Sequence, residues 1–302
     1  MRYGYWAPVF GGWLRNVADE REASWENASR LVKRSEALGY DLTLIAELNL
    51  NDIKGIEAPA LDAWSTAAAL AAVTETIELM VAVRPNFHQP ALFAKKAANI
   101  DRISNGRLAL NVVSSWWAKE AESYGLQFDQ HDDRYARTTE WLQVLARLWT
   151  EKRVDFEGRY YTLKDAIVEP KPTSSPDRPR PVIYAGGESE AAKTLIARHC
   201  DAYVMHGDEP EHIAAKIADM RARREGFGLP PMSYGTELER ELKIREYSVS
   251  NRGLRPGFVG TPETVRERIE AFEAAGLDLL LLQMSPQEEE MERFSAQVMR
   301  SD

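Results

Sequence analysis

A pair of glycines between an apolar run and a helix signal is the clearest candidate ligand site in the sequence. Gly186 and Gly187 follow Tyr184 and Ala185, and Ser189 stands where a helix would begin. Glycines allow backbone N–H groups to approach a ligand closely, and a helix N-terminus carries a partial positive charge. The pattern predicts phosphate binding, although an ordinary strand-to-helix turn has the same signature.

Polar residues at the ends of other expected elements could line the same site. Asn111 and Ser114 close an apolar run, where they would face the mouth of a barrel or simply cap the strand. His131 and Tyr135 are four residues apart and therefore share one face of the helix that they open. A purely structural role at the helix start is their alternative interpretation.

Charged and aromatic residues follow the first strands of the chain. Arg84 could bind an anion through two guanidinium nitrogens, or it could form a structural ion pair with Glu47. Asn49 lies in the same polar loop as Glu47. Tryptophans at strand ends or in loops could form the wall of a ligand site or pack in the core: these are Trp6, Trp13, Trp116 and Trp117.

The usual motifs of metal and nucleophilic chemistry are missing from the sequence. The five histidines do not form an H-E-x-x-H spacing, and a single cysteine, Cys200, argues against a structural zinc site. Neither a G-x-S-x-G elbow nor a Walker loop is present. This favours chemistry that a cofactor brings, with the protein supplying position and electrostatics.

Short apolar strands alternate with amphipathic helices along the chain, which predicts a parallel sheet with crossover helices. Seven strands can be recognised, and an eighth would have to lie between Gly235 and Pro256, in a charged stretch that is poor in β-branched residues. The expected fold is an α/β TIM (β/α)8 barrel whose seventh β/α unit is short or missing. Residues 151–180 are proline-rich and predict a hairpin excursion. The expected strands cover residues 2–9, 41–46, 77–83, 107–113, 181–185, 201–205 and 279–283.

The composition fits one domain spanning residues 1–302, with 44% hydrophobic and 28% charged residues. A net charge of −9 argues against nucleic-acid and membrane-surface partners. One cysteine excludes an internal disulfide and fits a reducing compartment. Neither a signal peptide nor an apolar run long enough for a bilayer is visible, so a cytoplasmic location is expected.

Taken together, several runs resemble the bacterial luciferase-like flavin-dependent monooxygenases, in particular the alkanesulfonate and dimethylsulfone monooxygenase branch, including sulfoquinovose monooxygenases. The resemblance covers about residues 2–235 and 252–299. Its opening run, residues 4–14, is most similar to the sulfone and sulfosugar enzymes. The other matching runs are residues 81–85, 94–107, 111–114, 131–135, 184–189 and 260–263.

The resemblance implies a site for reduced FMN, with O2 as the second substrate. Gly187, Glu188 and Ser189 would contact the phosphate, with His131 and Tyr135 beside the phosphate or ribityl chain. Asn111 and Ser114 would line the flavin edge, and Ala82 would lie under the ring. A separate NAD(P)H-dependent flavin reductase would supply the FMNH2, and the protein would form a homodimer or homotetramer.

The resemblance also implies an anionic organosulfur substrate, and sulfoquinovose, cleaved to sulfite and an aldehyde sugar, is the one we predict. A flexible lid is expected at about residues 236–257. Dimethyl sulfone, a short alkanesulfonate, another flavin reaction of the same fold and a non-catalytic flavin-binding barrel are the alternatives. Where alkanesulfonate enzymes carry a cysteine and an aromatic residue, this chain has Asn49 and Met284. Candidate substrate contacts are Trp6, Trp13, Glu47, Asn49, Arg15, Arg84, Trp116, His206, Arg252 and Arg255.

Overall fold

Parallel strands form a closed barrel in the computed structural model, which describes residues 1–13, 21–173, 178–239, 258 and 260–299. The eight barrel strands within these residues neighbour one another in the order β1-β10-β9-β8-β7-β4-β3-β2, and β1 also pairs with β2. Their bounds are β1 Arg2–Trp6, β2 Leu42–Ile45, β3 Glu78–Val83, β4 Leu108–Val112, β7 Val182–Gly186, β8 Ala202–His206, β9 Ser233–Glu239 and β10 Leu279–Gln283.

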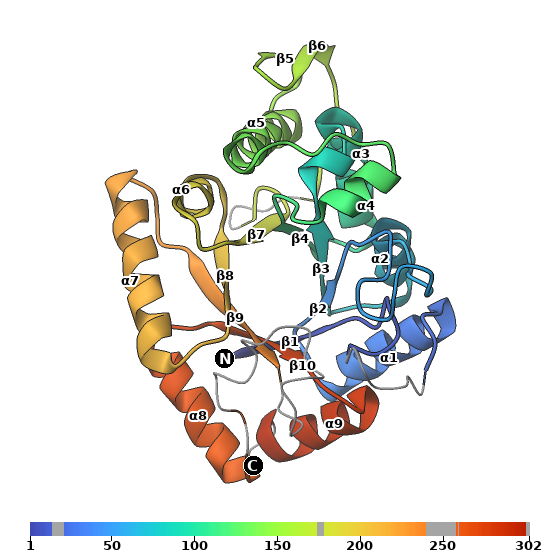
Figure 1. Ribbon diagram of the computed structural model, residues 1–302, viewed down its shortest axis with the longest axis vertical. Coiled ribbons are helices and arrows are strands. Elements are labelled where there is room, and N and C mark those ends of the chain that lie inside the picture. The colour runs from blue at the N-terminus through green and yellow to red at the C-terminus, as the bar shows by residue number, and fades with distance from the viewer. Residues whose placement is uncertain (14–20, 174–177, 240–257, 259, 300–302) are drawn as a thin grey trace.

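Helices surround this barrel, as Figure 1 shows. Several of them begin where the sequence signals predict. Ser24, Asp62 and Thr261 each accept a hydrogen bond from a first-turn backbone amide. The main helices are α1 Trp25–Leu38, α2 Ala63–Val73, α3 Pro90–Ile103, α5 His131–Thr150, α6 Glu190–His199, α7 Pro210–Gly226, α8 Pro262–Ala274 and α9 Gln287–Phe294, and shorter turns are η1 Pro85–Phe87, α4 Ala118–Ser123 and η2 Ser295–Met299.

The strand that the sequence pattern failed to reveal is β9. It begins at Ser233, two residues before the segment in which we expected a deficient unit, and pairs in parallel with both β8 and β10. Thr236 is fully buried and donates to the Met205 carbonyl oxygen at 3.1 Å. The expectation of a short or missing seventh strand is therefore wrong. Its polar sequence concealed it, because a barrel strand flanked on both sides needs only part of its length to be apolar.

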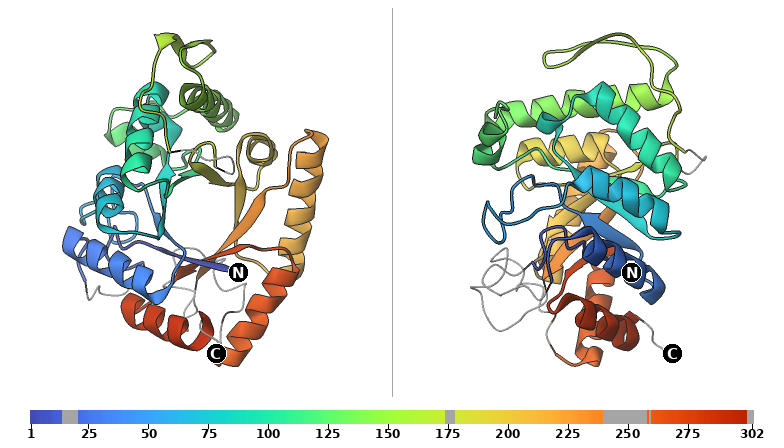
Figure 2. Two further views of the ribbon diagram at one scale, coloured as in Figure 1. Left: turned by 180° about the vertical axis from the view of Figure 1, so that it is seen from behind. Right: turned by 90° about the vertical axis from the view of Figure 1, so that its right-hand side faces the viewer.

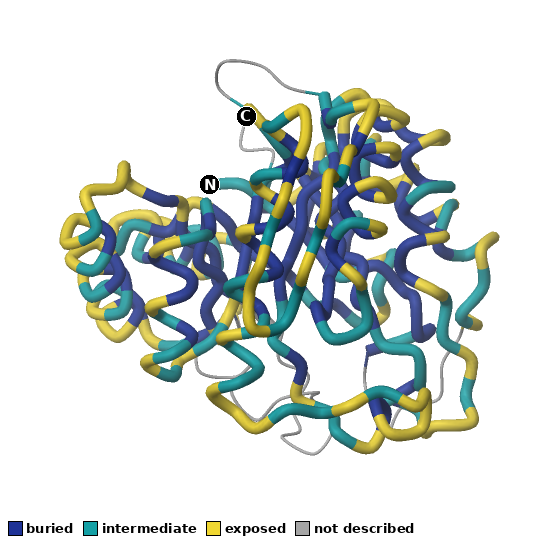
Figure 3. The backbone as a smooth tube through the Cα atoms, turned by 90° about the horizontal axis from the view of Figure 1, so that it is seen from above, coloured by how far each residue is buried: buried dark blue, intermediate teal, exposed yellow. Residues whose placement is uncertain are grey.

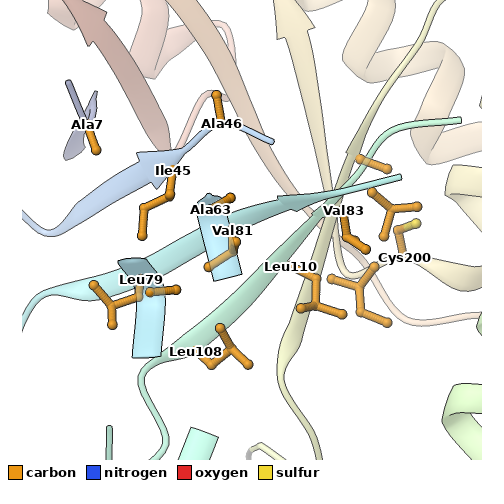
Figure 4. Packing of buried hydrophobic residues seen from close by; sticks show 14 of the residues in the cluster. Ala7, Ile45, Ala46, Ala63, Leu79, Val81, Val83, Leu108, Leu110 and Cys200 are labelled. Atoms are coloured by element: carbon orange, nitrogen blue, oxygen red, sulfur yellow. The ribbon is translucent and has the colours of Figure 1, made fainter. Parts of the chain in front are cut away.

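Two apolar layers hold the barrel together. The larger layer lies between the strands and the surrounding helices and includes Ile45, Val81 and Leu110 (Figure 4). The second layer combines side chains from different strands, among them Leu44, Met80 and Tyr184. The strands at the centre are accordingly buried while the outer faces of the helices are exposed (Figure 3).

A polar cluster joins the first residues of β1 and β3 to a tyrosine of β7. Arg2 of β1 donates to the Tyr184 hydroxyl at 3.1 Å, and that hydroxyl donates to Glu78 at 3.0 Å. Arg2 and Glu78 also form an ion pair at 3.4 Å. Because Arg2 and Glu78 begin their strands, the cluster lies towards the amino ends of these strands, away from their carboxyl ends.

The excursion at residues 151–180 contains an antiparallel hairpin of β5 (Val154–Glu157) and β6 (Thr162–Ala166). The hairpin lies at the periphery of the molecule beyond α5 (Figures 1 and 2). Glu140 of α5 accepts hydrogen bonds from the backbone amides of Arg159, Tyr160 and Tyr161, at 2.8, 2.9 and 3.3 Å. The tip is thus attached to α5 through its main chain.

Within the described residues, none of the helices combines the length and the apolar character that a bilayer crossing requires.

Candidate active site

The carboxyl ends of parallel barrel strands all open at one end, and this end is called the mouth below. One side of the mouth is formed by the turn from β7 to α6. Gly187 has a φ of +150°, and a Cβ at this position would lie 2.6 Å from the Ala192 Cβ. Only glycine therefore fits here without a backbone shift. Tyr203 donates a 3.1 Å hydrogen bond to the Gly187 carbonyl oxygen, and burial raises the pKa of Tyr203, which keeps this donor protonated.

Helix α5 contributes two predicted site residues to the same place. The Tyr135 hydroxyl lies 3.5 Å from the point that a Cβ of Gly187 would occupy. The rings of His131 and Tyr135 are 5.0 Å apart. Ser189 caps α6 by accepting from the Ala192 amide at 3.2 Å. The structure therefore brings together the glycine turn, the start of α6 and the first turn of α5.

Glu188 has a different setting from its neighbours in the turn. Its carboxylate is 3.0 Å from the Lys216 ammonium group of α7, and it is part-buried. The side chain is thus engaged in an ion pair with α7.

The predicted flavin-edge residues come from adjacent strands. Ala82 of β3 and Asn111 of β4 are register partners and share one face of the sheet. Asn111 is 7% exposed, and its Oδ1 has no hydrogen-bond partner among the described residues. Ser114 donates to the Thr138 hydroxyl at 3.1 Å, and its carbonyl oxygen accepts from Arg134 at 3.2 Å. Ser114 is therefore fixed against α5.

These residues fit a planar ligand that carries a phosphate. Asn111 offers a buried acceptor without a donor, and burying such an atom costs free energy unless a ligand pairs it. Ala82 leaves room beside it, since its side chain is a single methyl group. Gly187 and Ser189 offer a turn and a helix start to an anion. The described residues offer no cluster of histidine, cysteine and acidic side chains suited to a metal ion.

Aromatic residues form the side of the mouth next to β1. Trp6 ends β1 and packs partly buried against both apolar layers. Its ring meets that of Trp13 edge-on at 4.8 Å, and Trp13 in turn meets Phe10 at 5.3 Å. The indole N–H groups of Trp6 and Trp13 are both buried and lack an acceptor within the described part of the chain. This cluster can exclude water and still donate hydrogen bonds.

A buried charge network lies beyond the ends of β2 and β3. Arg84 is 2% exposed and is bound by the fully buried Glu120, with its NH2 nitrogen 3.1 Å from the Glu120 Oε1. The Arg84 Nε is 3.5 Å from Glu47. Glu47 also accepts from the Arg84 backbone amide at 2.7 Å and the Trp64 indole at 2.9 Å, and it is 2.6 Å from the His88 ring.

This network decides between the two interpretations that the sequence left open for Arg84. The structure shows the ion pair with Glu47, and a second carboxylate, Glu120, completes it. Sequence reasoning missed Glu120 and His88. The one usable signal was Arg84 itself, because a buried guanidinium has five N–H donors, and a single carboxylate cannot accept from all of them.

The remaining predicted substrate residues are placed differently. Asn49 is bound through its backbone by Glu120, at 2.5 Å. Trp116 is 56% exposed and stacks in parallel on Trp117 at 5.7 Å. His206 ends β8 and is exposed. Arg15, Arg252 and Arg255 lie outside the described residues, as does most of the expected lid.

The sequence model of one family, described as luciferase-like monooxygenase, matches residues 1–240. The chain belongs to this family.

Two curated proteins are similar to this chain in sequence along nearly its whole length. These are FMNH2-dependent dimethylsulfone monooxygenases of Pseudomonas putida and Pseudomonas fluorescens (strain Pf0-1), 28% and 27% identical. The alignments cover 99% of this chain and 94% and 93% of the relatives. Among solved structures, EDTA monooxygenase (EmoA) from Chelativorans sp. BNC1 is similar with a TM-score of 0.81 and 19% identity, over 99% of this chain and 92% of that one. This structural likeness supports the luciferase-like fold.

Proposed function

We propose that this luciferase-like monooxygenase is the oxygenase of a two-component system. A separate NAD(P)H-dependent reductase supplies FMNH2, and the enzyme uses it with O2 to cleave a carbon–sulfur bond. The similarity to FMNH2-dependent dimethylsulfone monooxygenases along the whole chain supports this proposal. The fit of the mouth to a planar, phosphate-bearing ligand, with its unpaired Asn111 acceptor, supports it independently.

The substrate we favour is a small sulfone such as dimethyl sulfone. The observation that carries this choice is the pairing of Arg84 with Glu47 and Glu120, since two buried carboxylates already balance its charge and both of its terminal nitrogens bind Glu120. The Trp6 and Trp13 indole N–H groups could donate to sulfonyl oxygens instead. Sulfoquinovose, which the sequence favoured, would need cations from outside the described residues, such as Arg252 and Arg255.

In this proposal, different residues of the mouth bind the flavin, place its ring and exclude water. Gly187, Ser189, His131 and Tyr135 hold the phosphate end of the flavin. Asn111 and Ala82 position its ring. When bound, reduced FMN supplies the electrons with which O2 oxidises the substrate. Trp6 and Trp13 exclude water and orient the substrate, which protects a reaction that would otherwise be lost to solvent.

Product analysis tests this proposal directly. With dimethyl sulfone, FMNH2 and O2, the balanced products are methanesulfinate, formaldehyde, FMN and water. A sulfonate would instead give an aldehyde and sulfite. The assay combines a flavin reductase, FMN, NADH and one candidate substrate, with the oxygenase omitted as the control. Formaldehyde from dimethyl sulfone is the expected result.

Other outcomes of this assay are equally informative. Sulfite from sulfoquinovose, without formaldehyde from dimethyl sulfone, would reverse the order of substrates. Absence of both products with every sulfone and sulfonate would refute the proposed function. In a separate binding titration, an enzyme that bound a deazaflavin tightly and did not bind reduced FMN would refute the proposed cofactor.

A further inference from the structure

Side chains of α4 and its C-terminal cap bind the loop after β2 through the backbone N–H and C=O of a single residue, Asn49. Glu120 accepts from the backbone amides of Asn49 and Leu50, at 2.5 and 3.4 Å. Tyr124, four positions after Glu120 and directly after the last residue of α4, donates its hydroxyl to the Asn49 carbonyl oxygen at 3.2 Å. Because residues four positions apart lie on the same side of a helical turn, Glu120 and Tyr124 can bind the N–H and the C=O of Asn49 together.

The contact between Glu120 and Asn49 is connected to buried charges in the protein interior. Glu120 is fully buried and bound to Arg84, and Arg84 is bound in turn to Glu47. Glu47 belongs to the same loop as Asn49, two residues earlier. The loop, the end of β3 and α4 are therefore joined in a closed ring of contacts. A ring of this kind resists movement more than a single hydrogen bond does, since no member can shift alone.

The loop so held is in a position to meet the substrate. Asn49 is half-buried, and both of its backbone groups are occupied while its side-chain amide makes no hydrogen bond to a described residue. Trp116 and Trp117 immediately precede α4, so the helix also fixes the segment that carries this stacked pair. The contacts of α4 thus set the relative placement of an amide and an aromatic surface at the mouth.

We propose that Glu120 and Tyr124 are positioning residues that determine which substrates the enzyme accepts. They act through Asn49, by fixing its backbone and so the place of its amide side chain. The proposal rests on the proposed function, since it concerns the substrate of that reaction. It assigns flavin binding to other residues, those of the β7–α6 turn and of α5.

Two variants and one matched control test the proposal. Tyr124→Phe removes one hydroxyl from an exposed residue and should leave folding intact. Glu120→Gln keeps an acceptor for the Asn49 amide but removes the charge that holds Arg84. Tyr160→Phe makes the same chemical change as the first variant in the turn of the peripheral β5–β6 hairpin, where the Tyr160 hydroxyl donates to Asp133 at 2.9 Å.

Three measurements are made on each purified full-length variant. The first is hydrogen–deuterium exchange at the amides of Asn49 and Leu50, which does not depend on the reaction. The second is the ratio of kcat/KM for dimethyl sulfone to that for the larger diethyl sulfone. The third is the Kd for reduced FMN. Tyr124→Phe should speed exchange at these amides and change the ratio of the two kcat/KM values by at least twofold. Glu120→Gln should have a larger effect on both quantities. Neither variant should change the Kd for reduced FMN by more than twofold. Tyr160→Phe should leave the exchange and the ratio unchanged.

The outcomes separate this proposal from the proposed function. Unchanged exchange, or an unchanged ratio in active Tyr124→Phe and Glu120→Gln enzymes, overturns the positioning role alone. Equal losses for both sulfones together with weaker FMN binding would indicate general structural damage and would also overturn it. If the wild-type enzyme oxidises none of the organosulfur compounds, the proposed function and the specificity role fall together.

Discussion

The two sides of the barrel mouth are built by different means. On the β7–α6 side, the important features belong to the main chain: the left-handed Gly187, the start of α6 and the carbonyl oxygen that Tyr203 holds. On the β2–β4 side they belong to side chains, namely the buried charges of Glu47, Arg84 and Glu120. A main-chain site suits a ligand group that stays the same, whereas a side-chain site can be altered residue by residue. The contrast explains why the cofactor can be inferred more readily than the substrate.

The largest expected effect comes from removing the central cation of the β2–β4 side. Arg84→Met would leave Glu47 and Glu120 buried without their partner, and breaking such a pair typically costs about 3–5 kcal/mol. Urea denaturation should show this loss in the free energy of unfolding.

Controls for Arg84→Met are available in the same chain. Arg153→Met removes one member of a solvent-exposed pair with Asp165 and should leave the free energy of unfolding nearly unchanged. Adding Glu47→Gln and Glu120→Gln to Arg84→Met should recover much of the loss. A midpoint for Arg84→Met equal to that of the wild type would contradict a stabilising network.

On the β7–α6 side, Gly187→Ala should act mainly on cofactor binding. The new Cβ would meet Ala192, and the backbone conformation is strained for any residue with a side chain, at about 1–3 kcal/mol. Displacement of the turn should weaken reduced FMN binding by about 10-fold to 100-fold, as measured by anaerobic titration. Gly228→Ala is the control, because its φ is also positive, at +66°, but its Cβ would meet nothing within 4 Å. Equal effects of the two would mean that strain alone, and not the turn, matters.

Asn111→Ala sharpens the comparison by separating binding from stability. If Oδ1 accepts from the flavin, its loss should weaken FMN binding by about 2-fold to 10-fold, which corresponds to about 0.5–1.5 kcal/mol. Because Oδ1 lacks a partner among the described residues, the unliganded protein should lose little stability.

Asn51→Ala is the matched control for this buried asparagine. Asn51 is 1% exposed, accepts from the amides of Ile53 and Lys54 and donates to the Pro59 carbonyl oxygen at 2.7 Å. Its loss should lower the free energy of unfolding by about 1–3 kcal/mol and leave flavin affinity intact. If Asn111→Ala lowered stability without weakening FMN binding, Asn111 would not belong to the cofactor site.

The last prediction concerns pH and the C-terminal end of α6. Burial, together with Arg198, lowers the pKa of His199 to about 4. In the unfolded chain the imidazole takes up its proton near pH 6.5, so the free energy of unfolding should fall as the pH drops from 6.5 towards 4. Because the side chain is partly exposed, the loss should not exceed about 2 kcal/mol. His199→Gln should flatten this part of the pH profile in urea titrations, and an unchanged slope would show that other groups cause it.

The sequence predicted the barrel and the main-chain side of the mouth well, because both leave local signals. Caps such as Ser24 and Thr261 and the glycines of the β7–α6 turn each report on their own neighbourhood. Strand β9 was missed because its pairing with β8 and β10, and not its own polar sequence, makes it a strand. Glu120 was missed because its partner Arg84 is distant in the chain, and only folding shows that a carboxylate on a short helix meets that guanidinium. The roles proposed for the mouth residues remain predictions.

The attachment of the β5–β6 hairpin has a consequence for how this barrel could diversify. Glu140 recognises main-chain N–H groups, which every residue except proline possesses. Most substitutions at the tip would therefore keep these bonds, and selection could alter its surface at little cost to the scaffold. Gly158 is an exception, since a Cβ there would collide with the Glu140 carboxylate. The exposed positions of the hairpin could therefore change while Glu140, Gly158 and the buried Val154 keep it attached to the barrel.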